Sequence, residues 1–438
     1  MALAINIEPA SPIAIHRQIY EAWRRGILSG RFAAGDRLPS TRELAVTLAV
    51  SRSTVSQAYE QLISEGYLQA ARGSGTFVCR ELPDRSLHAQ VAVKLTPHRA
   101  APPPLSRYGS GLSDDYPHEP CRAGFVCFSQ WGPDLVQFPW MLWRRTLSRH
   151  LRQTRHDVFD YAQQVEGYEP LRREIAAYVS RSRAVNCTPS QVIVVNGSQQ
   201  GLDLCGLICG DLGRGARVVY VTPSHQYPTG VAMSLNRRLE LLAWARRQSA
   251  VIIEDDYDSE YRYSGSPLPA LQGLAQEVPV VYCGTFSKVM FPSLRIGYLI
   301  VPDNLVPAFT RAKRLADNYT PILEQIALRD FIAGGHLARH IRRMRRLYGS
   351  RREALLEALK RHFGECATVH GEAAGMHAFV RIEDKALRER AERNKVQLRS
   401  AQPCFLEGSD VHHYLFGFAS LTERAIRNGI RRIAGRNA

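Results

Sequence analysis

The stretch YCGTFSKVMFPSLRIGY, residues 282–298, decides the fold of the larger part of this 438-residue chain. Lys288 lies in it between apolar residues, and the chain has only five other lysines. A lysine amine in an apolar setting has a lowered pKa, which makes it a nucleophile toward aldehydes. Thr285, Ser287 and Arg295 add two hydroxyl groups and a fixed cation, a set that suits a phosphate group. The stretch therefore predicts a site where a reactive amine and a phosphate lie side by side.

Runs rich in valine and isoleucine alternate with helical patterns around this stretch. They start at 191 (QVIVVNG), 216 (ARVVYVTP), 250 (AVIIEDD), 278 (VPVVYCG) and 295 (RIGYLIV). Such near-continuous apolar runs are typical of parallel strands that helices cover on both faces. We therefore expect an α/β fold with a mostly parallel sheet, and a ligand site beyond the carboxyl ends of its strands.

Two further strand ends supply groups of matching chemistry. Asp255 and Tyr257 follow the run AVIIEDD, where a carboxylate can keep a pyridinium nitrogen protonated and a phenol can hydrogen-bond to a ring oxygen. Gly197, Ser198 and Gln199 open a helix after QVIVVNG, and the free N–H groups of a helix start bind anions. Together with the lysine and hydroxyl groups of the first stretch, these residues describe a pyridoxal 5'-phosphate site.

The N-terminal part of the chain has a different pattern, dense in short helices. Ser40 and Glu43 have the spacing of a capping box, and Ser51 is placed to cap a further helix. After them GYLQAARGSGTFV alternates like two short strands around a glycine-rich tip that carries Arg72. Two short helices at a tight turn, with small polar and arginine side chains opening the second, fit the major groove of DNA. The apolar stripes are expected to hold Ile13, Ile15, Ile19, Trp23 and Ile27 in the first helix and Val55, Ala58, Tyr59, Leu62 and Ile63 in the third.

Residues 10–79 resemble the winged helix-turn-helix of the GntR family of bacterial regulators. The motifs that carry the resemblance are LPSTRELA, VSRSTV, AYEQLISEGYL and GSGTFV, in that order. The resemblance implies double-stranded DNA as a partner. Ser56 stands where some members of the family place a further base-reading arginine. The DNA contacts that the resemblance implies are Arg42, Ser51, Arg52, Thr54, Arg72 and Gly73.

Residues 122–438 resemble an aminotransferase class I domain of fold type I, through VTPSHQYPTG, IIEDDYDSEYRY and GTFSKVMFPSLRIGY. The fusion with a winged helix is similar to the MocR subfamily of GntR regulators. The resemblance implies that Lys288 forms a Schiff base with pyridoxal phosphate, Asp255 pairs the ring nitrogen and Tyr257 reaches the ring oxygen. It also implies a small C-terminal α/β subdomain and a homodimer in which Tyr161 reaches the neighbouring subunit's phosphate. The phosphate ligands that it implies are Ser198, Gln199, Thr285, Ser287 and Arg295.

The segment between Ser198 and Pro223 is too short for this family. It has room for one helix, to about Cys209, a loop and one strand, whereas the family has two further strands here. Since a βαβ unit needs roughly 30 residues or more, something on the order of fifty residues is missing. The lost stretch normally carries the aromatic residue that stacks on the pyridine ring. We expect the sheet to lack edge strands, which makes ARVVYVTP an apolar, exposed edge.

The arginine that clamps a substrate carboxylate in aminotransferases of this fold is also missing. Leu415 in HHYLFGFASL stands in its place, and Arg381 in HAFVRIED is more simply a strand residue. We therefore expect a DNA-binding regulator whose pyridoxal phosphate senses a small amino-containing or vitamin B6-related ligand, and not a productive enzyme. Two alternatives stay open: an active aminotransferase with an attached DNA-binding domain, and a truncated relic with impaired cofactor binding.

Charge, cysteines and linker composition complete the expected organisation. Lysine and arginine number 57 against 41 acidic residues, a net charge of +16 that favours a polyanionic partner. The nine cysteines form no short-spaced framework, and no signal peptide or membrane span is evident, so we expect reduced thiols in a cytoplasmic protein. The expected domains are a winged helix at 1–79, a linker rich in proline, glycine and serine at 80–121, and an aminotransferase-like domain at 122–438.

Overall fold

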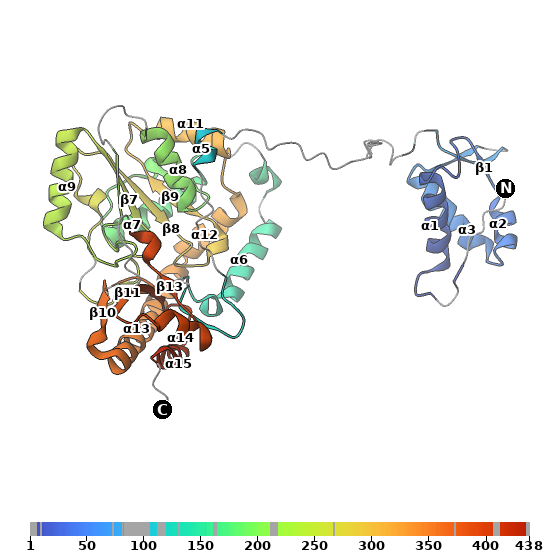
Figure 1. Cartoon of the computed structure of the whole chain (residues 1–438). Coiled ribbons are helices and arrows are strands. Elements are labelled where there is room, and N and C mark those ends of the chain that lie inside the picture. The colour runs from blue at the N-terminus through green and yellow to red at the C-terminus, as the bar shows by residue number, and fades with distance from the viewer. Residues whose placement is uncertain are drawn as a thin grey trace. The chain divides into compact units, whose positions relative to one another are not determined.

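The computed structural model divides the chain into two compact units, Met1–Asp115 and Tyr116–Ala438 (Figure 1). Arg72 and Gly73 at the wing tip, Tyr161 and most of the predicted linker lie outside the described residues. The domain boundaries at 79–80 and 121–122 stay predictions. The structure describes residues 7–8, 11–71, 74–80, 82, 106–111, 120–129, 132–153, 155–160, 164–210, 218–265, 268–371, 374–405 and 412–434.

The first unit combines three helices near the N-terminus and a one-turn helix farther along the chain with a small antiparallel sheet of order β1–β3–β2. This arrangement confirms the winged helix-turn-helix. The elements are α1 (Ile15–Leu28), β1 (Arg37–Leu38), α2 (Thr41–Thr47), α3 (Arg52–Ser64), β2 (Leu68–Ala71), β3 (Gly75–Val78) and, farther along the chain, the one-turn helix α5 (Arg107–Ser110).

Serine caps begin both helices of the predicted DNA-binding pair. Ser40 accepts the N–H of Glu43 at 3.2 Å, and the Glu43 carboxylate accepts the N–H of Ser40 at 2.8 Å. This is a complete capping box, as predicted. Ser51 accepts the N–H of Thr54 at 3.2 Å and begins α3. Because caps satisfy the first N–H groups of each helix, they fix where both helices start.

The core of the first unit contains most of the predicted apolar stripes, with two exceptions. Trp23 and Leu62 are fully buried at its centre. Ile13 is 53% exposed because it precedes the first turn of α1. Ile63 is 36% exposed because it lies about a quarter turn away from the buried side of α3. The prediction that these two side chains point inward is wrong.

The second unit is built on a five-stranded sheet of order β5–β9–β8–β7–β6. β6, β7 and β8 are parallel neighbours, and β9 runs antiparallel to both β5 and β8. The mostly parallel sheet is therefore confirmed. Its strands are β5 (Val192–Val195), β6 (Val218–Val221), β7 (Val251–Asp256), β8 (Val280–Thr285) and β9 (Gly297–Ile300).

Helices cover both faces of this sheet, because apolar residues on both sides of its strands need to be buried. In β5, Val192 and Val194 join one core while Ile193 and Val195 join another, which is the alternation of a strand buried on both faces. The first core includes α7 (Glu169–Arg183), α12 (Ile322–Ala333) and α13 (His336–Phe363). The second includes α8 (Ser198–Cys209) and α11 (Val306–Ala316), and a third lies between β7 and α9 (Leu235–Gln248).

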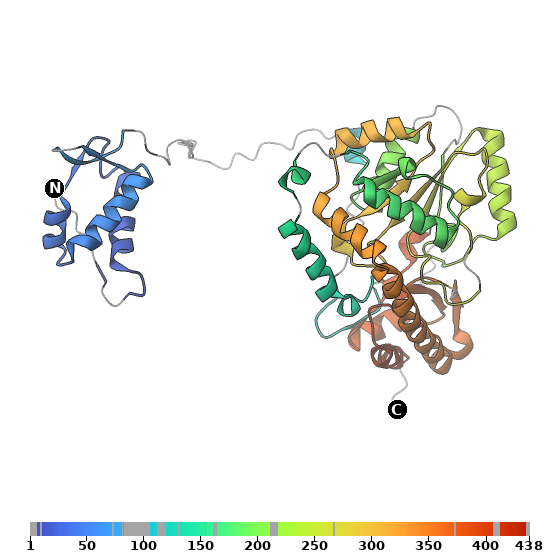
Figure 2. The ribbon, with the colours of Figure 1, turned by 180° about the vertical axis from the view of Figure 1, so that it is seen from behind.

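A second, antiparallel sheet of order β10–β11–β14–β13 forms the C-terminal subdomain. Figures 1 and 2 show its strands, with α13 to α15, at the end of the unit that carries the C-terminus. This confirms the small C-terminal subdomain. Its elements are β10 (Ala367–His370), β11 (His377–Ile382), α14 (Leu387–Arg393), β13 (Arg399–Ser400), β14 (His413–Gly417) and α15 (Glu423–Ile433), beside the parallel pair β4 (Val126–Cys127) and β12 (Val396–Gln397). The remaining helices are α6 (Trp140–Gln153), α10 (Leu271–Leu274) and the 3₁₀ turns Leu135–Gln137, His156–Phe159, Pro189–Gln191, Pro292–Leu294, Gly364–Cys366 and Gln402–Cys404.

The strand β6 is an edge of the sheet within the described residues, as the short segment predicted. Tyr220 on this strand is 53% exposed.

Cys205 and Cys209 are buried as small apolar residues, whereas Cys121 and Cys127 form a disulfide, so the expectation of reduced thiols is wrong for that pair. None of the helices described for this chain is both long and apolar enough to cross a membrane.

Candidate functional site

Strand register brings the predicted site residues to one edge of the five-stranded sheet. Gly297, the first residue of β9, pairs with Val195 at the end of β5 and with Thr285 at the end of β8. Asp256 at the end of β7 pairs with Gly284 of β8. The starts of α8 and β9, the end of β7 and the loop after β8 therefore meet at one edge. This is the expected place for a ligand of such a sheet.

Lys288 lies half-buried just beyond the end of β8. Burial lowers its pKa, and the neighbouring carboxylates of Asp258 and Asp255 act in the opposite direction. The amine therefore loses its proton more readily than an exposed lysine. That property suits a nucleophile that condenses with an aldehyde.

Asp255 is a buried carboxyl group with one oxygen left unused. Its Oδ2 accepts a hydrogen bond from the Tyr220 hydroxyl at 2.7 Å. Its Oδ1 has no hydrogen-bond partner among the described residues. Burial raises the pKa of Asp255 to about 6. An unpaired buried oxygen is costly, so this carboxyl group fits an incoming N–H donor such as a protonated ring nitrogen.

The uncapped start of α8 and the Arg295 side chain form an anion site. Gly197 precedes α8 at a φ of +83°, and no side-chain cap covers the first N–H groups. A Cβ atom at Gly197 would lie 2.7 Å from Nη2 of Arg295, so only glycine lets the guanidinium approach. Ser198 begins the helix half-buried, whereas Gln199 is exposed. A cation beside free helix N–H groups fits a phosphate group.

Two hydroxyl groups lie at the end of β8 and just after it, on Thr285 and Ser287. The Oγ1 of Thr285 accepts the N–H of Ser287 at 3.1 Å, which fixes the loop that carries Lys288. The Ser287 hydroxyl is buried and has no partner in the described part of the chain. Like Asp255, it is a buried polar group that a bound ligand would satisfy.

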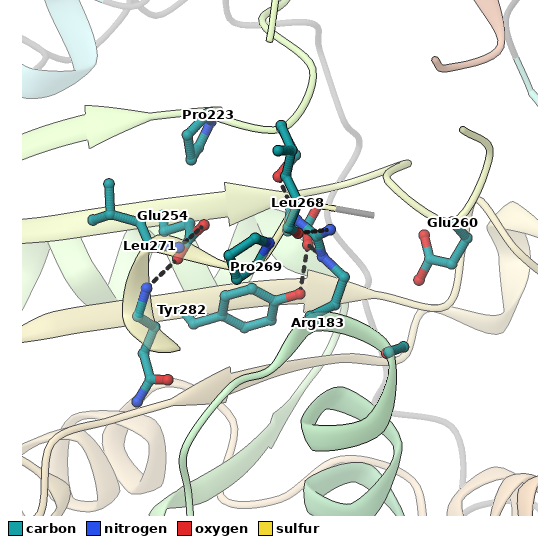
Figure 3. A network of polar contacts seen from close by, with 12 residues as sticks. Arg183, Pro223, Glu254, Glu260, Leu268, Pro269, Leu271 and Tyr282 are labelled. Atoms are coloured by element: carbon teal, nitrogen blue, oxygen red, sulfur yellow. Dashed lines mark hydrogen bonds and ion pairs between the residues drawn. The ribbon is translucent and has the colours of Figure 1, made fainter. Parts of the chain in front are cut away.

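The alternation of side chains along β7 explains why Asp255 faces the site, whereas Glu254 and Asp256 do not. Alternate strand residues point to opposite faces, and Glu254 points into a polar network beneath the sheet (Figure 3). Asp256, on the same face, accepts hydrogen bonds from Arg183 at 2.6 Å and Tyr282 at 2.7 Å. Glu254 accepts the backbone N–H groups at 271 and 272, both at 2.8 Å. These buried contacts hold β7 in place and leave Asp255 free for a ligand.

Tyr257 lies in a polar cluster that the sequence analysis did not identify. Its hydroxyl is 3.1 Å from Nδ1 of His225, which is also 2.9 Å from Asp258. His377 of β11 approaches the His225 ring, with centroids 5.1 Å apart. His225 stands in the quoted motif VTPSHQYPTG directly after β6, so its place after a strand was the one available signal. Asp258 offered the same signal in IIEDDYDSEYRY, two residues after β7, whereas His377 offered none, because its contact joins segments far apart in the chain.

The position of the missing carboxylate clamp is apolar. Leu415 is fully buried in β14, in a cluster with Phe379, Ala401 and Tyr227. Arg381 pairs with Glu383 at 3.0 Å, and its side chain is 45% exposed. Arg381 thus has an ionic partner of its own at the surface, which agrees with its interpretation as an ordinary strand residue.

In the first unit, Arg42 of α2 and Arg52 of α3 line one shallow hollow together with Ala45, Val46 and Val50. Both arginines are exposed. The Nε of Arg52 donates to the Thr41 hydroxyl at 3.4 Å, which directs it toward the start of α2. The two cations therefore lie on the same side of the helix pair.

Ser51 and Thr54 lie at the start of α3, where a recognition helix contacts DNA. Besides capping the helix, the Ser51 hydroxyl is 2.7 Å from the Thr54 hydroxyl. Ser51 is exposed and Thr54 is half-buried. The structure thus gives both residues a role in the cap, and their contact with DNA stays a prediction.

The fold and the site define a class of protein: a winged-helix regulator joined to a fold type I aminotransferase domain. Residues 15–78 match the family described as "Bacterial regulatory proteins, gntR family", and residues 216–433 match "Aminotransferase class I and II". The chain belongs to the MocR subfamily of the GntR family of transcriptional regulators.

Relatives of this family align along nearly the whole chain. The "Probable rhizopine catabolism regulatory protein MocR" of Rhizobium meliloti is 36% identical over 463 residues, which cover 95% of this chain and 92% of that protein. The "HTH-type pyridoxine biosynthesis transcriptional regulator PdxR" of Corynebacterium glutamicum is 32% identical over 397 residues, covering 82% of this chain and 81% of that protein. The crystal structure of LysN, an α-aminoadipate aminotransferase from Thermus thermophilus complexed with N-(5'-phosphopyridoxyl)-L-leucine, superposes with a TM-score of 0.64. It is 26% identical, and the match covers 71% of this chain and 92% of that one.

The Rhizobium alignment also measures the shortage in this chain. It spans 463 positions but includes only 95% of the 438 residues, so about 47 positions face no residue here. This total is of the same size as the loss of about fifty residues that the sequence predicts.

Proposed function

We propose that this regulator binds pyridoxal 5'-phosphate at the strand ends of its second unit and uses it to sense a small amino-containing or vitamin B6-related ligand. The observation that carries the proposal is the buried, unpaired Oδ1 of Asp255 at the same edge as Lys288. When bound, the cofactor supplies an aldehyde that condenses with amines and an electron-withdrawing pyridine ring. The family and the phosphopyridoxyl complex of a structural neighbour support its use.

Each end of the cofactor has its own residues in this proposal. Lys288 offers the amine, Asp255 accepts a hydrogen bond from the ring nitrogen, and Tyr257 donates to the ring oxygen. Tyr161 would add a contact from the second subunit of a homodimer. The phosphate is held by Ser198, Gln199, Thr285, Ser287 and Arg295.

The first unit would bind DNA. Arg42 and Arg52 are proposed to contact DNA in the major groove, with Ser51 and Thr54 at the start of α3 and Arg72 and Gly73 at the wing. Residues 1–79 and 122–438 are the proposed DNA-binding and effector domains, joined by a linker at 80–121. The protein would act in the cytoplasm, where its DNA lies.

An absorbance spectrum tests the cofactor assignment. The purified protein with added pyridoxal phosphate should show a visible band that Lys288→Ala abolishes and Lys360→Ala, at an exposed helix position, retains. A band that persists in Lys288→Ala, or no band in either protein, would contradict the proposal.

Gel-shift assays with upstream DNA test the other unit, since phosphate contacts make the affinity fall with salt.

An active aminotransferase is the second candidate, favoured by the presence of Lys288, Asp255 and Arg295 at one sheet edge. It predicts that an amino acid bleaches the visible band as the amino group moves to the cofactor. We rank it second because Leu415 offers no charge to a substrate carboxylate. A spectrum that recovers only after a keto acid is added would reverse this ranking.

A further inference from the structure

A buried group of three polar side chains surrounds Tyr257 beside the proposed cofactor site and has no part in that site so far. His225, Asp258 and His377 are each at most 2% exposed, and Tyr257 is next to them. Nδ1 of His225 lies 2.9 and 3.1 Å from the two oxygens of Asp258. The same nitrogen lies 3.1 Å from the Tyr257 hydroxyl. One ring nitrogen thus faces three oxygens.

The chemistry of these atoms decides where the hydrogens are. A carboxylate can only accept hydrogen bonds, so the His225 nitrogen that faces Asp258 must carry a hydrogen. That N–H is then shared between Asp258 and the oxygen of Tyr257. The nitrogen has no lone pair left for the phenol hydrogen. Tyr257 therefore accepts from His225 and keeps its own O–H for another partner.

The phenol retains its proton in this setting. Burial raises the pKa of Tyr257 far above its usual value, and the carboxylates of Asp258 and Asp255 raise it further. A protonated Tyr257 whose oxygen already accepts one hydrogen bond is a hydrogen-bond donor. The oxygen of a ligand at the adjacent site can receive it.

The backbone holds the His225 ring in one position. A Cβ atom on Gly375 would lie 2.0 Å from Cε1 of the ring, and one on Gly230 would lie 3.1 Å from its Nε2. Both glycines have positive φ, +84° and +69°. Because both residues are glycines, neither places a side chain against Cε1 or Nε2 of the ring. Nε2 has no hydrogen-bond partner in the described part of the chain. The backbone at both glycines therefore packs directly against the ring, and a side chain at either position would displace it.

We propose that His225, oriented by Asp258, is a positioning residue that sets Tyr257 as a hydrogen-bond donor to the ring oxygen of the bound cofactor. This inference rests on the proposed function. His225, Asp258 and His377 also have the residue types of a metal site, with ligand atoms within 4.8 Å of one another. The contacts of Nδ1 with Asp258, at 2.9 and 3.1 Å, have the length of hydrogen bonds, and we assign them as such.

Two substitutions of the same chemistry separate this role from simple packing. In His225→Asn the amide nitrogen takes the place of Nδ1, whereas in His225→Gln it takes the place of Nε2. We expect His225→Asn to bind pyridoxal phosphate about as well as the wild type. His225→Gln should bind about tenfold more weakly, the effect of one lost hydrogen bond, as titrated by the visible band. Equal losses in both variants would overturn the proposal.

A double-mutant cycle tests whether His225 acts through Tyr257. Tyr257→Phe removes the donor, so His225→Gln should have no further effect on cofactor affinity in that background. Additive effects would show that His225 acts by another route and would overturn the inference. Stoichiometric divalent metal in the purified chain, lost on His225→Asn, would also overturn it.

A readout without cofactor separates this inference from the proposed function. In the full chain labelled with ¹⁵N-histidine, the His225 signal, assigned by its loss in His225→Asn, should show a protonated Nδ1 before any cofactor is added. An unprotonated Nδ1 would overturn the inference even if the Lys288-dependent band forms. A protonated Nδ1 without that band would uphold the arrangement of Tyr257 as a donor while the cofactor assignment fails.

Discussion

The helix-turn-helix and the strand-end site of this protein are specified in opposite ways. In the first unit, the contacts that fix the helices join residues close in sequence: Ser40 and Ser51 each accept the N–H group of a residue three positions later. In the second unit, Asp255, Lys288 and Arg295 meet only because strands from distant parts of the chain pair in register. Changes in the first unit should therefore have small, local effects, whereas changes in the second should be larger and reach the site.

The largest expected effect comes from a buried ion pair behind α8. Nζ of Lys313 lies 2.8 and 2.9 Å from the oxygens of Asp317, and the lysine side chain is fully buried. The Oδ2 of Asp317 also accepts from Asn196 at 2.5 Å and Gln200 at 2.8 Å, which flank the start of α8. Lys313→Ala would leave this carboxylate without its cation, at a cost of about 3–5 kcal/mol.

Hydrogen exchange on the full chain, read separately for each unit, measures that loss. We expect faster exchange throughout the five-stranded sheet, weaker binding of pyridoxal phosphate, and unchanged exchange in α1 to α3. Lys360→Ala, at an exposed position of α13, is the matched control and should change little. If exchange became faster in α11 alone, the expectation that changes in the second unit spread to the site would be contradicted.

The pH dependence of stability should also differ between the units. Burial raises the pKa of both Glu254 and Glu260 to about 7. Their protonated forms favour the folded state, so their contribution is fully present below the unfolded pKa of about 4.5 and is lost as pH rises through 7. Each of the two groups should cost the second unit roughly 2–3 kcal/mol between pH 5 and 8, since one pKa unit corresponds to about 1.4 kcal/mol.

Glu260→Gln tests this prediction, because the amide stays uncharged and can still accept the hydrogen bond that Tyr178 donates at 2.7 Å. The variant should flatten part of the pH dependence in chemical denaturation of the full chain. A variant with the wild-type profile would show that Glu260 titrates normally in the folded protein.

The same contrast explains how far the sequence could predict the structure. Periodicity and caps located both helices of the helix-turn-helix, and Val/Ile runs located all five strands, since those signals act over a few residues. Strand-end reasoning found Asp255 and Lys288. It missed Tyr220, His225 and His377, whose contacts with the site depend on the pairing of strands and the docking of a second sheet. The inward predictions for Ile13 and Ile63 were wrong because a helical period does not show where a helix starts or how wide its buried stripe is.

A substitution in the first unit should have a smaller effect, on DNA affinity alone. Arg52→Ala should weaken binding by about 1–3 kcal/mol and lower the salt slope by about 1, because it removes one cationic contact. Arg25→Ala, in the last turn of α1, removes the same charge from an exposed position and is the control. Gel shifts at two salt concentrations compare the variants. Equal losses in both would mean that net charge, and not the α2–α3 hollow, determines affinity.

The smallest expected effect separates the two roles of Ser51. Ser51→Ala removes the cap of α3 and should destabilise the first unit by about 1 kcal/mol, seen as faster hydrogen exchange in α3 only. Ser51→Asp should restore that stability, because aspartate caps helices as well as serine does. It should nevertheless weaken DNA binding, since the added negative charge would repel the phosphates near the helix start. If Ser51→Asp binds DNA like the wild type, the start of α3 does not approach the DNA backbone, and Ser51 serves the fold alone.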